Sequence, residues 1–231
     1  MIKQIIRFKE VASTQDTAKR FVDQKNELAI SSLRQNRGRG RHGRTWFSPS
    51  GGLYVSLLLF PEVRVNSIPL LASLTVIRVL EDYGFSHLLI QWPNDVLLNR
   101  KKISGIICER CKNAVICGIG MNINNDRFSR ELEKATSLRI IAGKTFDVDE
   151  ILNHLVGKFN PLYKELQNEG IKVKEVLNYI DGIGESVEVI TSRAVIKGTV
   201  YDIDDDWALM LRDESGMIKK FYYGDVRQLK W

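Results

Sequence analysis

The segment at residues 53–60, LYVSLLLF, constrains the fold more strongly than any other stretch of the chain. Only Ser56 interrupts its run of apolar side chains, so the segment lacks the alternation typical of a strand with one solvated face. A strand of this kind is buried on both faces, because neither face offers polar side chains to water. The segment therefore predicts a central strand in a sheet that other elements cover on both sides.

Two long helices and several short strands are predicted around this segment. Pro69 is expected to open a helix whose apolar residues lie on one side and whose end is marked by Gly84. A second long helix is expected after Asp147, which forms an acidic version of a capping box with Glu150. Further strands are expected at residues 3–11, 27–33, 88–91, 96–98, 103–109 and 114–119. The close spacing of the later strands predicts a mixed, largely antiparallel sheet flanked by helices, in the α/β or α+β class.

The pattern changes at Glu185, after which short alternating strands are separated by tight turns. These strands are expected at residues 186–190, 193–203, 207–211 and 219–226. A run of such strands in so short a segment is typical of a small β-barrel of the SH3 type. We therefore predict two domains, a catalytic or binding domain at residues 1–184 and an SH3-like domain at residues 185–231.

Composition excludes some classes of protein and leaves others open. The chain is 44% hydrophobic and 27% charged, and it has neither a long apolar run nor a secretory signal, so we expect a cytoplasmic protein without a membrane span. The net charge of +6 suits a nucleic-acid binder, but equally a protein that binds a polyanionic small molecule or an acidic partner. Cys108 and Cys111 form a CxxC pair without a second pair, so we interpret them as small apolar side chains and not as zinc ligands.

An arginine- and glycine-rich segment at residues 34–46 is the first functional signal. Five arginines occur between Arg34 and Arg44, and three glycines are interleaved with them. Glycines let backbone amides approach an anion closely, and guanidinium groups offer forked donors to carboxylate and phosphate oxygens. The segment could therefore wrap an anionic ligand, and it could equally be a flexible RNA-binding segment. A Walker-type phosphate loop is excluded, because no GK[ST] sequence follows.

Two further clusters lie between predicted strands. Residues 91–95, QWPND, form a rigid corner with an aromatic face, an amide and a carboxylate, which suits a nucleotide but also fits an ordinary turn. Lys102 enters an apolar strand near Gly105, so its ammonium group is expected to point inward, with an exposed turn lysine as the alternative. The glycines of residues 118–124, GIGMNIN, indicate close backbone approach, without the third glycine and helix of a dinucleotide site.

The motifs STQD, GRGRHGRTW, QWPNDV with the downstream RKKISG, and GIGMNIN occur in this order, and together they resemble the biotin protein ligases. The resemblance covers nearly the whole chain, and the pairing of the arginine segment with WPND and its lysine is specific to that family. It implies a catalytic domain like that of class II aminoacyl-tRNA synthetases. The family's larger members begin with a helix-turn-helix domain, whereas this chain begins at the first catalytic strand, so a monofunctional enzyme without a nucleic-acid partner is expected.

The activity implied by the resemblance is that of an ATP-dependent biotin–[acetyl-CoA-carboxylase] ligase. Such an enzyme joins biotin to AMP as biotinyl-5′-AMP and then transfers biotin to a lysine of a biotin carboxyl carrier protein domain. ATP and Mg²⁺ are the implied cofactors and biotin is the substrate. The carrier domain of acetyl-CoA carboxylase is the implied partner, and the family's habit also points to a homodimer.

The resemblance also assigns roles to single residues. Lys102 and Arg41 are the implied catalytic residues, at the reacting carboxylate and the α-phosphate. The implied biotin-binding residues are Ser13, Thr14, Gln35, Gly38, Arg39, Arg41, Trp46, Lys102, Gly105 and Gly118. The implied ATP- or adenylate-binding residues are Arg39, Arg41, Trp46, Asn94, Asp95, Lys102 and Asn122, with Asp95 also near Mg²⁺. Gln15 replaces the family's usual asparagine and Gln91 its common lysine, so the contact of the first is open and a charge is missing at the second.

Two other functions remain open at this point. A lipoate–protein ligase would share the fold and the adenylation chemistry, but it is not expected to combine GRGRHGR with WPND. A non-catalytic RNA-binding module would use the arginine segment and the C-terminal barrel. That second function leaves Lys102, WPND and GIGMNIN without an explanation.

Overall fold

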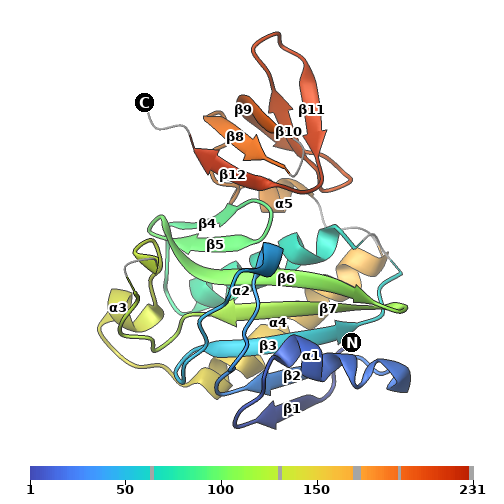
Figure 1. Ribbon diagram of the computed structural model, residues 1–231, viewed down its shortest axis with the longest axis vertical. Helices are drawn as coiled ribbons and strands as arrows, with labels where there is room; N and C mark the ends of the chain where they lie inside the picture. Colours follow the sequence, from blue (N-terminus) through green and yellow to red (C-terminus); the bar gives the residue numbers. More distant parts are fainter. Residues whose placement is uncertain (63–64, 130–131, 169–172, 192–193, 229–231) are drawn as a thin grey trace.

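A seven-stranded sheet forms the larger part of the computed structural model (Figure 1). The structure describes residues 1–231 except 63–64, 130–131, 169–172, 192–193 and 229–231. The strands are β1 (Ile5–Phe8), β2 (Leu28–Ser32), β3 (Leu53–Leu59), β4 (Leu88–Gln91), β5 (Asp95–Leu98), β6 (Lys101–Cys111) and β7 (Ala114–Met121). Their order is β1-β2-β3-β7-β6-β5-β4; β1 and β2 pair in parallel, and the other neighbours pair antiparallel. The predicted mixed, largely antiparallel sheet is confirmed.

Helices cover both faces of this sheet. The helices on the faces are α1 (Thr14–Lys19), α2 (Ser67–Asp82) and α4 (Val148–Asn168), and the shorter helices are α3 (Leu138–Ala142) and α5 (Val173–Leu177). Every residue of β3 is buried: Leu57 belongs to the main core with α2 and α4, and Leu58 belongs to a smaller cluster with Ala18 of α1. Figure 1 shows α1 in front of the sheet, with α2 and α4 behind it. The prediction of a strand buried on both faces is therefore confirmed.

The ends of the helices follow from local chemistry. α2 begins two residues before the predicted start, and Pro69 lies in its first turn, where the missing N–H has no intrahelical partner to lose. Gly84, with φ of +83°, follows the end of that helix. At α4, the carboxylate of Asp147 accepts hydrogen bonds from the backbone N–H groups of Asp149 and Glu150 at 2.8 and 3.1 Å. The sequence analysis did not predict the short helix α3.

The C-terminal part is a five-stranded antiparallel sheet of order β11-β10-β9-β8-β12. Its strands are β8 (Ser186–Ile190), β9 (Val195–Ile203), β10 (Leu209–Arg212), β11 (Ile218–Phe221) and β12 (Asp225–Gln228). The prediction of one strand at residues 219–226 is wrong, because the chain turns after Phe221 and at Gly224 adopts φ of +144°. As a result β11 and β12 lie at opposite edges of this sheet, and Asp225 begins the strand that faces the larger domain (Figure 1).

Within the described residues, no helix is both long enough and apolar enough to cross a lipid bilayer. The predicted division between residues 184 and 185 stays a prediction.

Candidate active site

A cavity of about 310 Å³ lies on the α1 side of the seven-stranded sheet. Its walls come from the start of α1, from β6 and β7, from Asp225, and from the arginine- and glycine-rich segment, residues 34–46, which we call the flap. The cavity brings together Ser13, Thr14, Gln35, Arg39, Arg41, Trp46, Asn94, Asp95, Lys102, Gly105, Gly118 and Asn122. Gly38 does not line it: a Cβ there would lie 2.4 Å from Ser48 Oγ and from the carbonyl of Trp46, so this glycine lets the base of the flap pack.

One end of the cavity is polar and tightly organised. The side-chain oxygen of Gln35 accepts hydrogen bonds from the backbone N–H of Thr14 at 2.8 Å and from its hydroxyl at 3.1 Å. The Thr14 hydroxyl in turn accepts from Ser56 Oγ at 2.8 Å. These bonds fix the first turn of α1 against the flap and β3, so the polar groups at this end are held in place by the protein itself.

Two acceptors at the same end have no partner within the described part of the chain. Ser13 Oγ and Gln15 Oε1 are both buried and make no hydrogen bond, although Gln15 Nε2 donates to the carbonyl of Ile116 at 3.2 Å. Buried polar atoms are usually hydrogen-bonded, because an unpaired one loses its solvation without compensation. This end of the cavity is therefore suited to a compact ligand group that carries N–H donors.

The floor of the cavity is made of glycines beneath an indole ring. A Cβ on Gly120 would lie 2.4 Å from Trp46 Nε1, and a Cβ on Gly105 would lie 2.8 Å from Trp46 Cζ3. At Gly118 the nearest atoms would be those of Gln15 and Ile107, at 3.0 Å. The absence of side chains at Gly105 and Gly120 lets the indole lie directly on β6 and β7. The predicted close approach at the GIGMNIN segment is thus an approach of Trp46 to the sheet.

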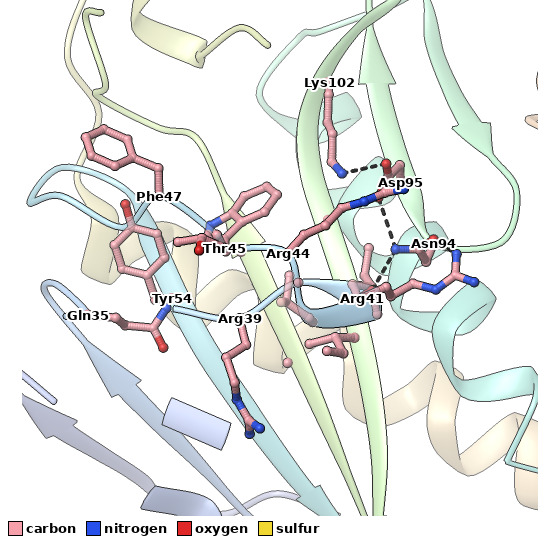
Figure 2. A pocket seen from close by; sticks show the side chains of 18 of the residues that line it. Gln35, Arg39, Arg41, Arg44, Thr45, Phe47, Tyr54, Asn94, Asp95 and Lys102 are labelled. Atoms are coloured by element: carbon pink, nitrogen blue, oxygen red, sulfur yellow. Dashed lines mark hydrogen bonds and ion pairs between the residues drawn. The ribbon is translucent and has the colours of Figure 1, made fainter. Parts of the chain in front are cut away.

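The opposite end of the cavity carries positive charge. Lys102 Nζ lies 2.5 Å from Asp95 Oδ2 and 5.3 Å from the centre of the Trp46 ring (Figure 2). The Lys102 side chain is 34% exposed and lines the cavity, so it is not the fully solvated turn lysine of the alternative interpretation. Its ammonium group is held by one carboxylate and one aromatic face, and it remains accessible to an anion in the cavity.

Arg41 joins this end of the cavity to the C-terminal sheet. Its Nη1 donates to Asn94 Oδ1 at 2.8 Å and lies 3.3 Å from Asp225 Oδ1, and its Nη2 donates to the carbonyl of Gly224 at 3.2 Å. Arg44 Nη2 binds the other oxygen of Asp225 at 2.8 Å. Burial lowers the pKa of Arg41 from its usual value, while the nearby carboxylate of Asp225 acts in the opposite direction. The guanidinium remains a cation at neutral pH, since an arginine does not lose its proton in proteins.

Arg39 points to the other side of the flap from Arg41 (Figure 2). Its Nη2 binds Asp16 Oδ1 at 2.8 Å and Glu109 Oε2 at 3.2 Å, while its Nε is buried and has no partner among the described residues. One part of the guanidinium is thus occupied by protein carboxylates, and its buried Nε–H is left without an acceptor among the described residues. The predicted contact of Arg39 with a carboxylate or phosphate stays a prediction.

Comparison with protein families now identifies the group to which this arrangement belongs. The model described as "Biotin/lipoate A/B protein ligase family" matches residues 8–126, and the model described as "Biotin protein ligase C terminal domain" matches residues 182–227. The chain belongs to the biotin/lipoate A/B protein ligase family. Members of this family that resemble it include the bifunctional ligase/repressor BirA of Bacillus subtilis, which is 33% identical over 98% of this chain and 74% of the relative.

One further relative and one solved structure are similar to this member of the family. The biotin–[acetyl-CoA-carboxylase] ligase of Paracoccus denitrificans is 30% identical over 81% of this chain and 85% of the relative. The solved structure of the biotin protein ligase from Aquifex aeolicus in complex with biotin and ATP superimposes with a TM-score of 0.90 at 32% identity, covering 99% of this chain and all of that one. The expected fold, including the C-terminal domain, is therefore the fold of the family.

The structure adds residues to the site of this family member that the sequence analysis missed. Asp225, Phe128, Leu132 and Tyr54 all line the cavity. Asp225 stands 184 positions from Arg41, in a short strand without any recognisable motif, so no local signal could have indicated it. Gln91, which stands where the family commonly has a lysine, is directed toward the C-terminal sheet. Its Nε2 lies 3.5 Å from the carbonyl of Val226.

Asp95 fits the predicted magnesium role to a limited degree. Its carboxylate lies in the cavity beside Lys102, and Asn94 Nδ2 donates to it at 3.1 Å. The described residues contain no group of three or more metal-binding side chains. A single carboxylate suits Mg²⁺, which is usually bound by one or two carboxylates together with water and substrate phosphates. The magnesium role of Asp95 stays a prediction.

Proposed function

We propose that this protein activates biotin with ATP as biotinyl-5′-AMP and transfers the biotin to a lysine of a carrier protein domain. The order of chemical groups along the cavity carries the proposal. Unpaired acceptors at Ser13 and Gln15 suit the N–H groups of a cyclic urea, the Trp46 indole suits the apolar ring and chain, and Lys102 with Arg41 suits a carboxylate. The similarity to ligases whose names and structures specify biotin supports the same function.

The first step needs charge neutralisation and alignment more than it needs a protein nucleophile. An oxygen of the biotin carboxylate attacks the α-phosphorus of ATP, the bond to the β-phosphate oxygen breaks, and pyrophosphate leaves. Both reactants are anions, so Lys102 and Arg41 hold them together and offset the negative charge that grows on the phosphate oxygens. Asp95 would help to hold Mg²⁺, which would supply further charge neutralisation at the phosphates.

The second step transfers the acyl group to an amine. The neutral amine of the acceptor lysine attacks the carbonyl carbon of the mixed anhydride, and AMP leaves with the bonding electrons. Water competes with the lysine as the nucleophile. The flap covers the cavity through the contacts of Trp46, Arg39 and Arg41, and this cover excludes water and retains the adenylate between the two steps.

Exchange of labelled pyrophosphate into ATP tests the first step directly. We expect exchange that depends on biotin and that lipoate does not support, because a dithiolane ring has no N–H donors for Ser13 Oγ and Gln15 Oε1. Exchange with lipoate alone would favour the lipoate ligase, and no exchange with either acid would refute the proposal. Addition of a biotin carboxyl carrier domain should then give one biotinylated lysine, detected as a mass increase of the carrier.

The narrower expectations belong to the same proposal. The acceptor is the carrier domain of acetyl-CoA carboxylase, as in the name of the Paracoccus relative, and the reaction takes place in the cytoplasm. Strand β1 lies at one edge of the seven-stranded sheet, where a homodimer could continue the sheet, and sedimentation of the purified protein tests that assembly. The C-terminal sheet would form an SH3-like barrel, with a domain boundary between residues 184 and 185.

A further inference from the structure

Four charged side chains form a closed cluster beside the flap. Arg39 Nη2 lies 2.8 Å from Asp16 Oδ1 and 3.2 Å from Glu109 Oε2. Lys19 Nζ lies 2.9 Å from Glu109 Oε2 and 3.4 Å from Asp16 Oδ1. The two cations and two carboxylates balance one another. They come from three separate elements, since Asp16 and Lys19 lie in α1, Glu109 lies in β6 and Arg39 lies in the flap.

Glu109 is the best shielded member of the cluster. Its side chain is 24% exposed, against 37% for Arg39 and 48% for Asp16. Like Asp16, it accepts both cations on the same oxygen, but it lies in β6, so it is the member that joins the flap to the sheet. The hydrogen bond to Glu109 also raises the pKa of Lys19, in accord with a stable pairing.

The position of Arg39 within the flap extends the effect of this anchor to the wall of the cavity. Residues 39 and 45 form an antiparallel bridge, and the backbone N–H of Trp46 donates to the carbonyl of Gly38 at 3.0 Å. The backbone N–H of Gly40 donates to the carbonyl of Arg44 at 2.7 Å. The two arms of the flap are thus hydrogen-bonded to each other, and holding Arg39 on one arm also holds Trp46 on the other.

We propose that Glu109, assisted by Asp16, is a positioning residue that anchors the flap through Arg39 and thereby holds Trp46 in the wall of the cavity. The carboxylates bind Nη2 of Arg39 and leave its buried Nε–H without a partner in the described part of the chain, so the same contact orients a donor for the ligand. The identity of that ligand rests on the proposed function. The anchor itself does not, because it consists only of contacts between side chains of the protein.

Hydrogen exchange of the flap in ligand-free protein tests the anchor. In Glu109→Gln the amides of Gly40 and Trp46 should exchange about fivefold faster than in the wild type, because a neutral amide replaces the carboxylate of a partly shielded ion pair. Asp16→Asn should act in the same direction and serves as the second variant if Glu109→Gln does not fold. Asp149→Asn is the matched control, since it breaks the ion pair with Arg7 outside the cavity and should leave flap exchange unchanged.

Kinetics separates a positioning role from a merely structural one. In Glu109→Gln the KM for biotin should rise about fivefold while kcat of adenylation stays within about twofold, because the flap closes less often but closes in the same geometry. The proposal would be overturned if the flap amides exchanged at the wild-type rate in both Glu109→Gln and Asp16→Asn. It would also be overturned if Glu109→Gln lowered the melting temperature and left the KM for biotin unchanged. Faster flap exchange in a protein that fails to bind biotin would support the anchor and reject the proposed function, so the two failures are distinguishable.

Discussion

The two sides of the flap are held by different parts of the molecule, although Arg39 and Arg41 are separated by one glycine. Arg39 binds Asp16 and Glu109, which belong to the larger domain, and its side chain is 37% exposed. Arg41 contacts Asn94 and the C-terminal residue Asp225, and its side chain is 20% exposed. The first contact ties the flap to its own sheet, and the second ties it to another domain.

This difference separates two tasks that one loop performs. The Arg39 side lies near the start of α1, where the polar end of the cavity is built, so its anchoring should govern retention of the small acid. The Arg41 side lies beside Asn94 and Asp95, where the phosphates would bind, so its contacts should govern use of ATP. The C-terminal sheet thus contributes to the positively charged end of the cavity through one carboxylate and one backbone carbonyl.

The largest effect is expected from Arg41→Gly, which removes the guanidinium from the phosphate end. Loss of one such charge contact typically costs about 3 kcal/mol of barrier, so adenylation should slow about 100-fold. The flap would also lose its contacts with Asn94 and Asp225, so free biotinyl-AMP should escape and biotinylate lysines without selection. Mass-spectrometric counting of modified lysines in a mixture of proteins checks this, and unchanged selectivity for the carrier domain would contradict it.

A smaller effect is expected from Gly120→Ala, which acts on both sides of the flap through Trp46. The new Cβ would lie 2.4 Å from Trp46 Nε1 and 2.5 Å from Cε2, so the indole must leave the sheet. Overpacking of this kind typically costs about 1–3 kcal/mol, and we expect the KM for biotin to rise about tenfold. Gly157→Ala is the matched control, because nothing lies within 4 Å of its Cβ. An unchanged KM for biotin in Gly120→Ala would show that the indole is not part of the biotin site.

Asp225→Asn should affect only the Arg41 side. Arg41 and Arg44 would lose their shared carboxylate, and the half-buried Arg41 would be less well fixed, so the KM for ATP should rise about fivefold with little change in the KM for biotin. Asp213→Asn is the control in the turn between β10 and β11, since Asp213 pairs with Lys219 and does not line the cavity. A lower KM for ATP in Asp225→Asn would mean that this carboxylate competes with the phosphates for Arg41.

The contrast between the two arginines also shows where the sequence was informative. The apolar run of β3, the helix after Pro69 and the WPND corner were predictable, because each depends on side chains close together in the chain. The inward position of Lys102 was also predictable, because a charge in an apolar strand is stable only beside a polar cavity or a partner of opposite charge. Partners such as Asp225 could not be predicted, because the contact with Arg41 depends on how two domains pack.

Glu109 illustrates the same limit within one domain. It stands 70 positions from Arg39, and a charged residue in the last part of a strand is most simply explained as solvated. The short helix α3 could have been found, since Ser137 Oγ accepts from the backbone N–H of Ile140 at 3.1 Å and Gly143 adopts φ of +69° just after the helix. A serine followed by a glycine six residues later is, however, a weak signal for a helix of a single turn.

The smallest effect concerns salt, and it distinguishes the two sides by their exposure. The Debye length falls to about 3 Å at 1 M salt, so the more exposed cluster of Arg39, Asp16 and Glu109 should be screened more than the contact of Arg41 with Asp225. Flap exchange in the wild type should therefore rise about twofold between 0.1 and 1 M NaCl and approach that of Glu109→Gln. Over the same range of NaCl concentration, the KM for ATP of Asp225→Asn, divided by that of the wild type, should change less. If high salt removed the difference in hydrogen exchange and the difference in KM to the same extent, the contacts of Arg39 and Arg41 would be equally exposed to solvent. The proposed division of the flap into two independently fixed sides would then be wrong.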